Sequence, residues 1–252
     1  LGGWGSATVY QAKSGKFEHI GFWARIGSKM RPDMWANDVR GFTDIWRFPL
    51  FDDHRNLCGY TSIMTPGTVA GFGEIHARYA TKPWADLLQP SIDLSREGYH
   101  VPEFVAEHVR TSMLPELPHP KDRYAVNDAA RALFHGPDGY MMETGHFYRN
   151  PDQARSLERI ATNGPQEFYT GGLADEIVAD FEANGAFVTR EDLAGYQPVV
   201  EPPLRTTYRG YEVVSSAVPG GGLLTLQILN VLEQFDIGAM DHSGPEHGFV
   251  VA

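Results

Sequence analysis

The chain has 252 residues, of which 42% are hydrophobic and 21% are charged, and its formal net charge at pH 7 is −11. This composition is typical of a globular protein with one large domain or two small ones. The acidic balance argues against a nucleic-acid partner, because phosphate recognition needs a basic surface. The sequence has no apolar run of about 18 residues, so we expect no membrane-spanning helix.

The N-terminal part predicts two strands, over residues 7–12 and 17–26, joined by Lys13-Ser14-Gly15-Lys16. Both are apolar on both faces, which is typical of strands buried between layers. The following residues, up to 64, place aromatic side chains among Asp, Asn and Arg, which indicates an ordered loop held by its aromatic residues. Those aromatic residues are Trp35, Phe42, Trp46, Phe48 and Phe51.

Residues 65–185 predict a mainly helical region. Thr68 follows Pro66-Gly67 and can cap a helix, while Pro83 and Pro90 each suit a first helical position. Gly98 suits a left-handed helix end, so we expect three short helices followed by extended residues 99–101. Further helices are predicted over 102–111 and 127–135, with a turn at 136–139. Asn150 is expected to cap a helix that begins at Pro151 and stops at Gly164, and the next helix carries Phe168, Ile177, Val178 and Phe181 and stops at Gly185.

The C-terminal part predicts a short helix, a strand and a long helix. Thr189 opens the short helix, with Asp192 three residues later near the positive end of its dipole. The strand covers 211–216, and we expect it in one central sheet with the two N-terminal strands. The helix over 223–235 is apolar all round and is therefore predicted to be buried against that sheet.

Cysteine and histidine give no sign of a disulfide or a metal site. Cys58 is the one cysteine, and the sequence has neither zinc-ligand spacing nor an HExxH motif. The glycine-rich turn at 220–222 could hold an anion on its backbone N–H groups, but it matches no nucleotide-binding motif. We therefore expect no metal and no cofactor.

Three stretches carry a resemblance to a known family. The first is TPGTVAGF from Thr65, followed by the short motifs Pro83-Trp84, Gln89-Pro90 and Arg96-Glu97-Gly98. The second is NPDQARSLERIATNGPQEFYTGG from Asn150, and the third is TREDLAGY from Thr189 with YRGYEVVSSAVPGGG from Tyr208. In this order, and over about two thirds of the chain, they resemble the large subunit of the gamma-glutamyltransferase (gamma-glutamyl transpeptidase) family. The chain begins at Leu1-Gly2-Gly3 without a methionine, so we expect a large-subunit fragment.

The resemblance implies an α+β fold, the four-layer αββα sandwich of N-terminal-nucleophile hydrolases. Residues 1–252 would be a single fragment of that fold, with strands and the aromatic loop in 1–64, helices in 65–185, and a strand plus buried helix in 186–252. It also implies an amidohydrolase or acyltransferase of glutathione metabolism that cleaves its own precursor. A threonine that starts the small subunit attacks the amide, with its own α-amino group as the base.

On this basis we expect no catalytic residue in this chain, and we expect as partners the small subunit of the same precursor and a small-molecule amide. A related acylase or amidohydrolase acting on a non-glutamyl amide is the alternative, and a non-catalytic helical interaction module is a second one. A serine hydrolase would need a GxSxG elbow, which the sequence lacks. The compartment stays open: periplasmic or extracellular if typical of the family, or cytoplasmic.

One substrate-binding element of the family is implied to lie in this chain. An arginine in an FRE-like tripeptide holds the α-carboxylate of the glutamyl group, and the matching tripeptide here is Phe22-Trp23-Ala24. Trp23 thus stands where the arginine is expected, and Arg25 would share its face if the strand continued. Either Arg25 takes over this role, or the acyl group lacks the carboxylate, or Trp23 is core and Arg25 a surface charge.

Overall fold

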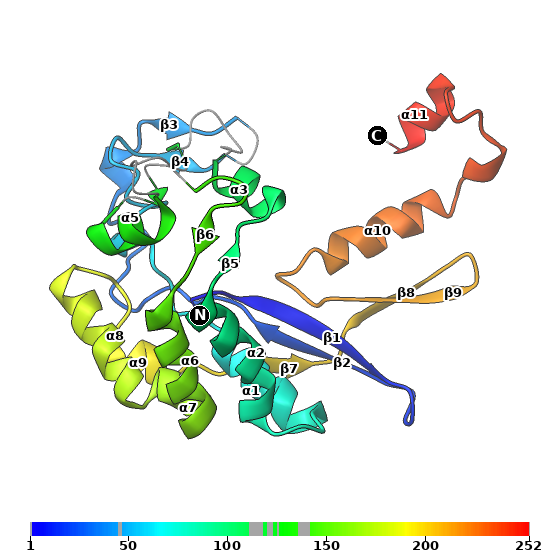
Figure 1. The fold of residues 1–252 in the computed structure, drawn as a ribbon. Helices are drawn as coiled ribbons and strands as arrows, with labels where there is room; N and C mark the ends of the chain where they lie inside the picture. The colour runs from blue at the N-terminus through cyan, green and yellow to red at the C-terminus, as the bar shows by residue number, and fades with distance from the viewer. Residues whose placement is uncertain are drawn as a thin grey trace.

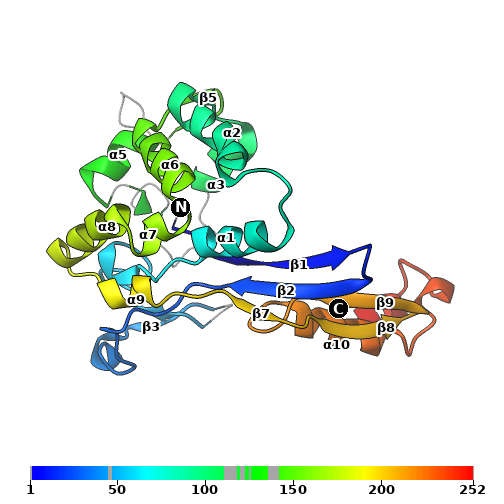
Figure 2. The ribbon, with the colours of Figure 1, turned by 90° about the horizontal axis from the view of Figure 1, so that it is seen from below.

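The computed structural model describes residues 2–44, 47–110, 118–119, 123–124, 126–135 and 142–251; Trp46 and the predicted turn at 136–139 lie outside these ranges. A three-stranded sheet forms the middle of the molecule (Figure 1). Figure 2 shows α1, α2 and α6 on one side of the β1–β2 hairpin and α10 on the other. Among the described residues, none of the helices has the length and apolar character needed to cross a bilayer.

The three-stranded sheet has β2 (Lys16–Phe22) at its centre, with β1 (Gly5–Gln11) and β7 (Val199–Glu201) antiparallel on its two edges. Ile20 and Phe22 of β2 are buried, whereas Tyr10 of β1 is 55% exposed. The expectation of a fully buried hairpin is therefore correct for the end of β2 and wrong for β1. The predicted strand over 17–26 also ends earlier than expected, at Phe22.

The strand predicted over 211–216 does not join this sheet. It is β9 (Tyr211–Ser215), and it pairs with β8 (Leu204–Tyr208) in a separate two-stranded sheet. Pro202 and Pro203 separate β7 from β8. Since proline has no N–H to donate to a ladder, this pair ends the central sheet and begins a new hairpin.

The first helical segment contains two helices where three were expected. They are α1 (Thr68–Tyr79) and α2 (Trp84–Glu97), and Pro90 lies inside α2. Packing against α6 (Pro151–Asn163) keeps α2 continuous: Ile92 is buried, and Trp84 Nε1 donates to the Ile160 carbonyl at 2.9 Å. The lost backbone hydrogen bond at the proline is thus tolerated.

The backbone N–H groups at the start of α1 find a different hydrogen-bond acceptor from the predicted Thr68 side chain. Gly67 occupies the N-cap position and makes no side-chain cap, so Thr68 is the first helical residue. The N–H groups of Gly67 and Thr68 instead donate to the carbonyl oxygen of Gly3, at 3.0 and 3.1 Å. The N-terminal segment before β1 is thereby tied to the start of α1.

Two predicted helix starts are confirmed: Asn150 caps its helix by accepting from the Gln153 N–H, and Thr189 forms a capping box with Asp192. Asn127, predicted as the first helical residue, is instead the cap and accepts from the Ala130 N–H. The single helix predicted to carry Phe168 and Phe181 is two helices, Gln166–Tyr169 and Gly172–Ala183. The remaining helices are α3 (Glu103–Arg110), α5 (Asp128–Phe134), α7 (Gln166–Tyr169), α8 (Gly172–Ala183), α9 (Arg190–Ala194), α10 (Gly222–Leu232) and α11 (Pro245–Val251).

Short elements complete the described part of the chain. The aromatic loop contains β3 (Gly41–Phe42) paired with β4 (Pro49–Leu50), and β5 (Tyr99–His100) pairs with β6 (Phe147–Tyr148). Three 3-10 turns lie at Ala36–Asp38, Tyr60–Ser62 and Ile237–Ala239. The larger core cluster joins α1, α6, α7, α8 and α9; its buried members include Val69, Ile160, Phe168, Tyr169, Leu173, Leu193 and Tyr196.

The prediction that the apolar helix over 223–235 is buried is wrong for this structure. The helix α10 packs on β8 and β9 with Leu226 buried, and Thr206 Oγ1 donates to Asn230 Oδ1. Its opposite side faces solvent, with Leu224 63% and Val231 59% exposed. A helix that is apolar all round needs two covered sides, and the described residues cover one.

Candidate functional site

The candidate site is the end of β2, where the tripeptide Phe22-Trp23-Ala24 lies. Phe22 points toward α1, with its ring 5.9 Å from that of Phe72. Trp23 packs against Trp4, with ring centroids 5.3 Å apart, and its carbonyl oxygen accepts a hydrogen bond from the Tyr196 hydroxyl at 2.7 Å. The indole N–H of Trp23 is buried and has no partner among the described residues.

Arg25 lies beyond the strand and does not share a strand face with Trp23. Its backbone pairs with Thr65 in an isolated bridge, with N···O distances of 3.0 and 2.8 Å. Its guanidinium donates to the Gln197 carbonyl at 2.8 Å and lies 4.9 Å from the centre of the Tyr196 ring. The sequence placed Arg25 near the site, but this side chain reaches the segment after α9.

Two tyrosines that the sequence analysis did not single out connect this site to α1. Tyr169 stacks on Tyr196 at 5.6 Å, and its hydroxyl donates to the Pro66 carbonyl and accepts from the Ala70 N–H. Burial raises the pKa of Tyr169, and it also raises the pKa of Tyr196 despite the opposing charge of Arg25. Both hydroxyls therefore stay protonated at neutral pH and act as hydrogen-bond donors.

His19 and Gly21 lie on one face of β2, and Trp23, just past the end of the strand, lies on the same side. His19 is 0% exposed; its Nδ1 lies 3.1 Å from Thr8 Oγ1, and its Nε2 has no partner among the described residues. Burial lowers the pKa of His19, and the charge of Glu201 opposes this shift. The spacing of residues 19, 21 and 23 along a strand was the sequence signal that could have grouped them.

An apolar cavity of about 560 Å³ begins beside the tripeptide. The residues that line it include Trp4, Ala24, Ile63, Phe168, Leu173 and Ile177. A cavity of this size and character is large enough for a small organic group. None of the described residues that line it is a lysine or an arginine.

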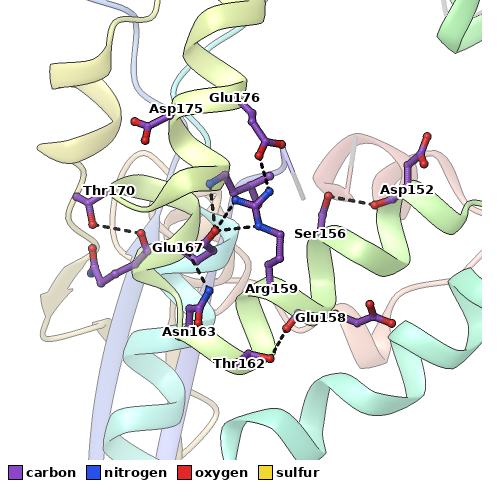
Figure 3. A network of polar contacts seen from close by, with 12 residues as sticks. Asp152, Ser156, Glu158, Arg159, Thr162, Asn163, Glu167, Thr170, Asp175 and Glu176 are labelled. Carbon is purple, nitrogen blue, oxygen red and sulfur yellow. Dashed lines mark hydrogen bonds and ion pairs between the residues drawn. The ribbon is translucent and has the colours of Figure 1, made fainter.

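A polar network holds α6, α7 and α8 together (Figure 3). The carboxylate of Glu167 accepts from Arg159 Nη2 at 2.7 Å, from Asn163 Nδ2 at 3.2 Å and from the Leu173 N–H at 3.1 Å. The hydrogen bond from Arg159 lowers the pKa of Glu167. Since Leu173 lines the cavity, the network fixes one wall of it.

Within the described ranges, no cluster of three or more His, Cys, Asp or Glu side chains could hold a metal ion. The end of β2 gathers Trp23, the neutral imidazole of His19, the two protonated tyrosines and the Arg25 guanidinium, which is held by the Gln197 carbonyl and the Tyr196 ring. The apolar cavity beside this cluster is the part of the site that can accept a small organic group.

Comparison with known proteins gives the family. The family model described as gamma-glutamyltranspeptidase matches residues 1–250. A glutathione hydrolase proenzyme of Escherichia coli is 34% identical over 238 residues, which is 94% of this chain and 38% of that protein. An acylase ACY 1 proenzyme of a Pseudomonas strain is 32% identical over 189 residues, 75% of this chain and 32% of that protein. The chain thus spans well under half the length of these relatives.

A solved structure agrees with the sequence matches. The gamma-glutamyltranspeptidase of Helicobacter pylori is similar over 99% of this chain and 67% of that chain, with a TM-score of 0.84 and 27% identity. This similarity confirms the predicted α+β fold of the N-terminal-nucleophile hydrolases. The chain belongs to the gamma-glutamyltranspeptidase family.

Proposed function

We propose that this chain is the large-subunit part of a self-processing amidohydrolase or acyltransferase whose acyl donor lacks the α-carboxylate of a glutamyl group. Family membership supports the reaction class, because the similar glutathione hydrolase and acylase are both named proenzymes. In the proposed enzyme a threonine at the start of the small subunit attacks the amide carbonyl. The acyl group then passes to water or to an amine.

The observation that carries the choice of acyl group is the position of Trp23. An indole offers apolar area and one N–H donor, whereas a guanidinium makes two charge-assisted bonds to a carboxylate. Arg25 is not a free substitute, because its guanidinium is engaged by the Gln197 carbonyl and the Tyr196 ring. Losing the family's arginine without a replacement would weaken glutamyl binding by about 2–5 kcal/mol, by analogy with a truncated buried charge pair.

The surface of α10 supports the presence of a further subunit. Its solvent-facing side carries Leu224, Ile228 and Val231, each about half exposed or more. An apolar surface of this kind is typical of an interface, and α10 would bury it against the rest of the precursor. We also expect the isolated chain 1–252 to cleave no amide, because in the proposed enzyme the attacking threonine belongs to the other subunit.

The test is a kinetic comparison on the processed two-chain enzyme. A gamma-glutamyl para-nitroanilide and an uncharged acyl para-nitroanilide of equal chain length should differ in kcat/KM, with the uncharged substrate turned over faster. Trp23→Arg should move the ratio toward the glutamyl substrate. Faster glutamyl turnover by the unaltered enzyme would refute the proposed acyl group, and amide cleavage by purified 1–252 alone would refute the subunit assignment.

A further inference from the structure

The apolar cavity of about 560 Å³ adjoins the tripeptide Phe22-Trp23-Ala24. Ala24 lines the cavity, and so does Trp4, whose ring packs on that of Trp23 with centroids 5.3 Å apart. Met64 and Pro66, from the segment that leads into α1, line it as well. The cavity therefore lies next to the segment that, by the family resemblance, meets the acyl group.

The lining of the cavity includes both buried and exposed side chains. Phe168 and Leu173, from α7 and α8, are 4% and 7% exposed. Trp4 and Met64, in contrast, are 61% and 40% exposed. The cavity therefore joins the protein interior to the surface, as a site for a substrate group must.

The chemistry of this lining suits an aliphatic group. The described lining residues carry no charge, and the polar side chains among them are two serines. Ser62 Oγ donates to the Gly59 carbonyl at 2.8 Å, and Ser156 Oγ donates to the Asp152 carbonyl at 3.1 Å. Because both hydroxyl hydrogens are used within the chain, a carboxylate in the cavity would lose water and gain no cation.

Hydrogen bonds hold two parts of the lining in place. The Leu173 N–H donates to the Glu167 carboxylate at 3.1 Å, and the Pro66 carbonyl accepts from the Tyr169 hydroxyl at 2.9 Å. A site whose walls are already fixed loses little conformational freedom when a ligand enters. Fixed walls also let a cavity discriminate between chains of different length.

We infer that the cavity binds an unbranched aliphatic acyl chain of about eight carbons, which takes about 240 Å³ at about 30 Å³ for each methylene-sized group. Ile177 is the specificity-determining residue for chain length, because it lines the cavity from α8 and is partly buried against the larger core cluster. The inference rests on the proposed function and goes further by naming the class of acyl group that replaces the glutamyl group.

The experiment uses the processed two-chain enzyme and the acetyl, butanoyl, hexanoyl, octanoyl and dodecanoyl para-nitroanilides. From acetyl to octanoyl, kcat/KM should rise by about threefold for each added methylene, because each one leaves water for the cavity. The gain should be smaller between octanoyl and dodecanoyl. The mono-anilide of octanedioic acid, whose equally long chain ends in a carboxylate, should have a kcat/KM about tenfold or more below that of the octanoyl anilide.

Variants of Ile177 separate a role in chain selection from a role in folding. Ile177→Trp fills part of the cavity and should shift the preferred chain to butanoyl or hexanoyl. Ile177→Ala enlarges the cavity and should shift the preference toward dodecanoyl, whereas a purely structural role would lower the turnover of all chains alike. Leu94→Trp is the matched control, because Leu94 is 53% exposed on α2 and is not among the described residues of the lining.

Equal kcat/KM from acetyl to octanoyl would overturn the inference and leave the proposed function standing. That result is expected if another segment of the precursor fills the cavity. The inference also fails if both Ile177 variants keep the chain-length preference of the unaltered enzyme, as Leu94→Trp should. Failure to turn over any of the uncharged anilides would overturn the proposed function and this inference with it.

Discussion

The hydroxyl of Tyr196 donates a hydrogen bond to the carbonyl oxygen of Trp23 at 2.7 Å, although the two residues are 173 positions apart. Tyr196 lies in the segment between α9 and β7, and Trp23 lies one residue past β2. The same tyrosine stacks on Tyr169, whose hydroxyl bridges the Pro66 carbonyl and the Ala70 N–H. The end of β2 and the start of α1 are therefore held by one aromatic pair.

Tyr196→Phe should destabilise the enzyme by about 1 kcal/mol, because the Trp23 carbonyl loses its donor within a buried region. Urea unfolding followed by circular dichroism measures the change. Tyr211→Phe is the matched control, since the side chain of Tyr211 is 77% exposed. Equal unfolding midpoints for the two variants would show that the hydrogen bond contributes nothing to stability.

Arg25→Ala should lower the thermal unfolding midpoint slightly and leave the ratio of glutamyl to uncharged acyl turnover unchanged. The reason is that the Arg25 guanidinium is held by the Gln197 carbonyl and lies over the Tyr196 ring. Steady-state kinetics with the two anilides measures the ratio. A selective loss of glutamyl turnover would instead show that Arg25 binds the substrate carboxylate, and Arg31→Ala, at an exposed position, controls for loss of charge.

The ionised carboxylate of Glu167 should stabilise the enzyme at neutral pH, and this contribution should be lost in acid. Its pKa is lowered from the ordinary value of 4.5 by the hydrogen bond from Arg159, so the folded state binds its proton less readily than the unfolded state. Its contribution is present above pH 4.5 and is lost as the pH falls through the lower folded-state pKa.

Thermal unfolding between pH 3 and pH 7 tests this dependence. Glu167→Gln should lower stability at pH 7 and flatten the acid side of the profile. Glu176→Gln serves as the control, because Glu176 bonds the same arginine but its side chain is 68% exposed. A profile for Glu167→Gln parallel to that of the unaltered enzyme would contradict the prediction.

Local signals in the sequence predicted several helix ends. The Asn150 cap, the Thr189–Asp192 capping box and the stops at Gly98 and Gly164, which both have positive φ, depend on interactions within a few residues. These interactions are encoded where they occur, so a pattern can reveal them.

The errors arose where distant segments decide the structure. Gly3 satisfies the start of α1 in place of a Thr68 cap, and packing on α6 keeps Pro90 inside a helix. The engagement of Arg25 by the Gln197 carbonyl joins residues 172 positions apart, so it could not be predicted from local spacing.

Gly71 lies in the PGTVAGF stretch, and the structure gives a physical reason for a glycine there. A Cβ atom at position 71 would lie 2.1 Å from Cγ and 2.3 Å from Cδ1 of Phe22, which is 5% exposed and has little room to move. Helix propensity alone would favour alanine by about 1 kcal/mol. Overpacking costs about 1–3 kcal/mol and more for contacts this short, so the clash should dominate.

We therefore expect Gly71→Ala to destabilise the enzyme by about 2 kcal/mol and to lower kcat/KM for every acyl substrate, because Trp23 directly follows the displaced Phe22. Urea unfolding and anilide kinetics measure both effects. Gly41→Ala is the control, since a Cβ at position 41 meets no atom within 4 Å. Adding Phe22→Leu to Gly71→Ala should recover part of the stability by shortening the opposing side chain; strictly additive losses would mean that Gly71 and Phe22 do not interact.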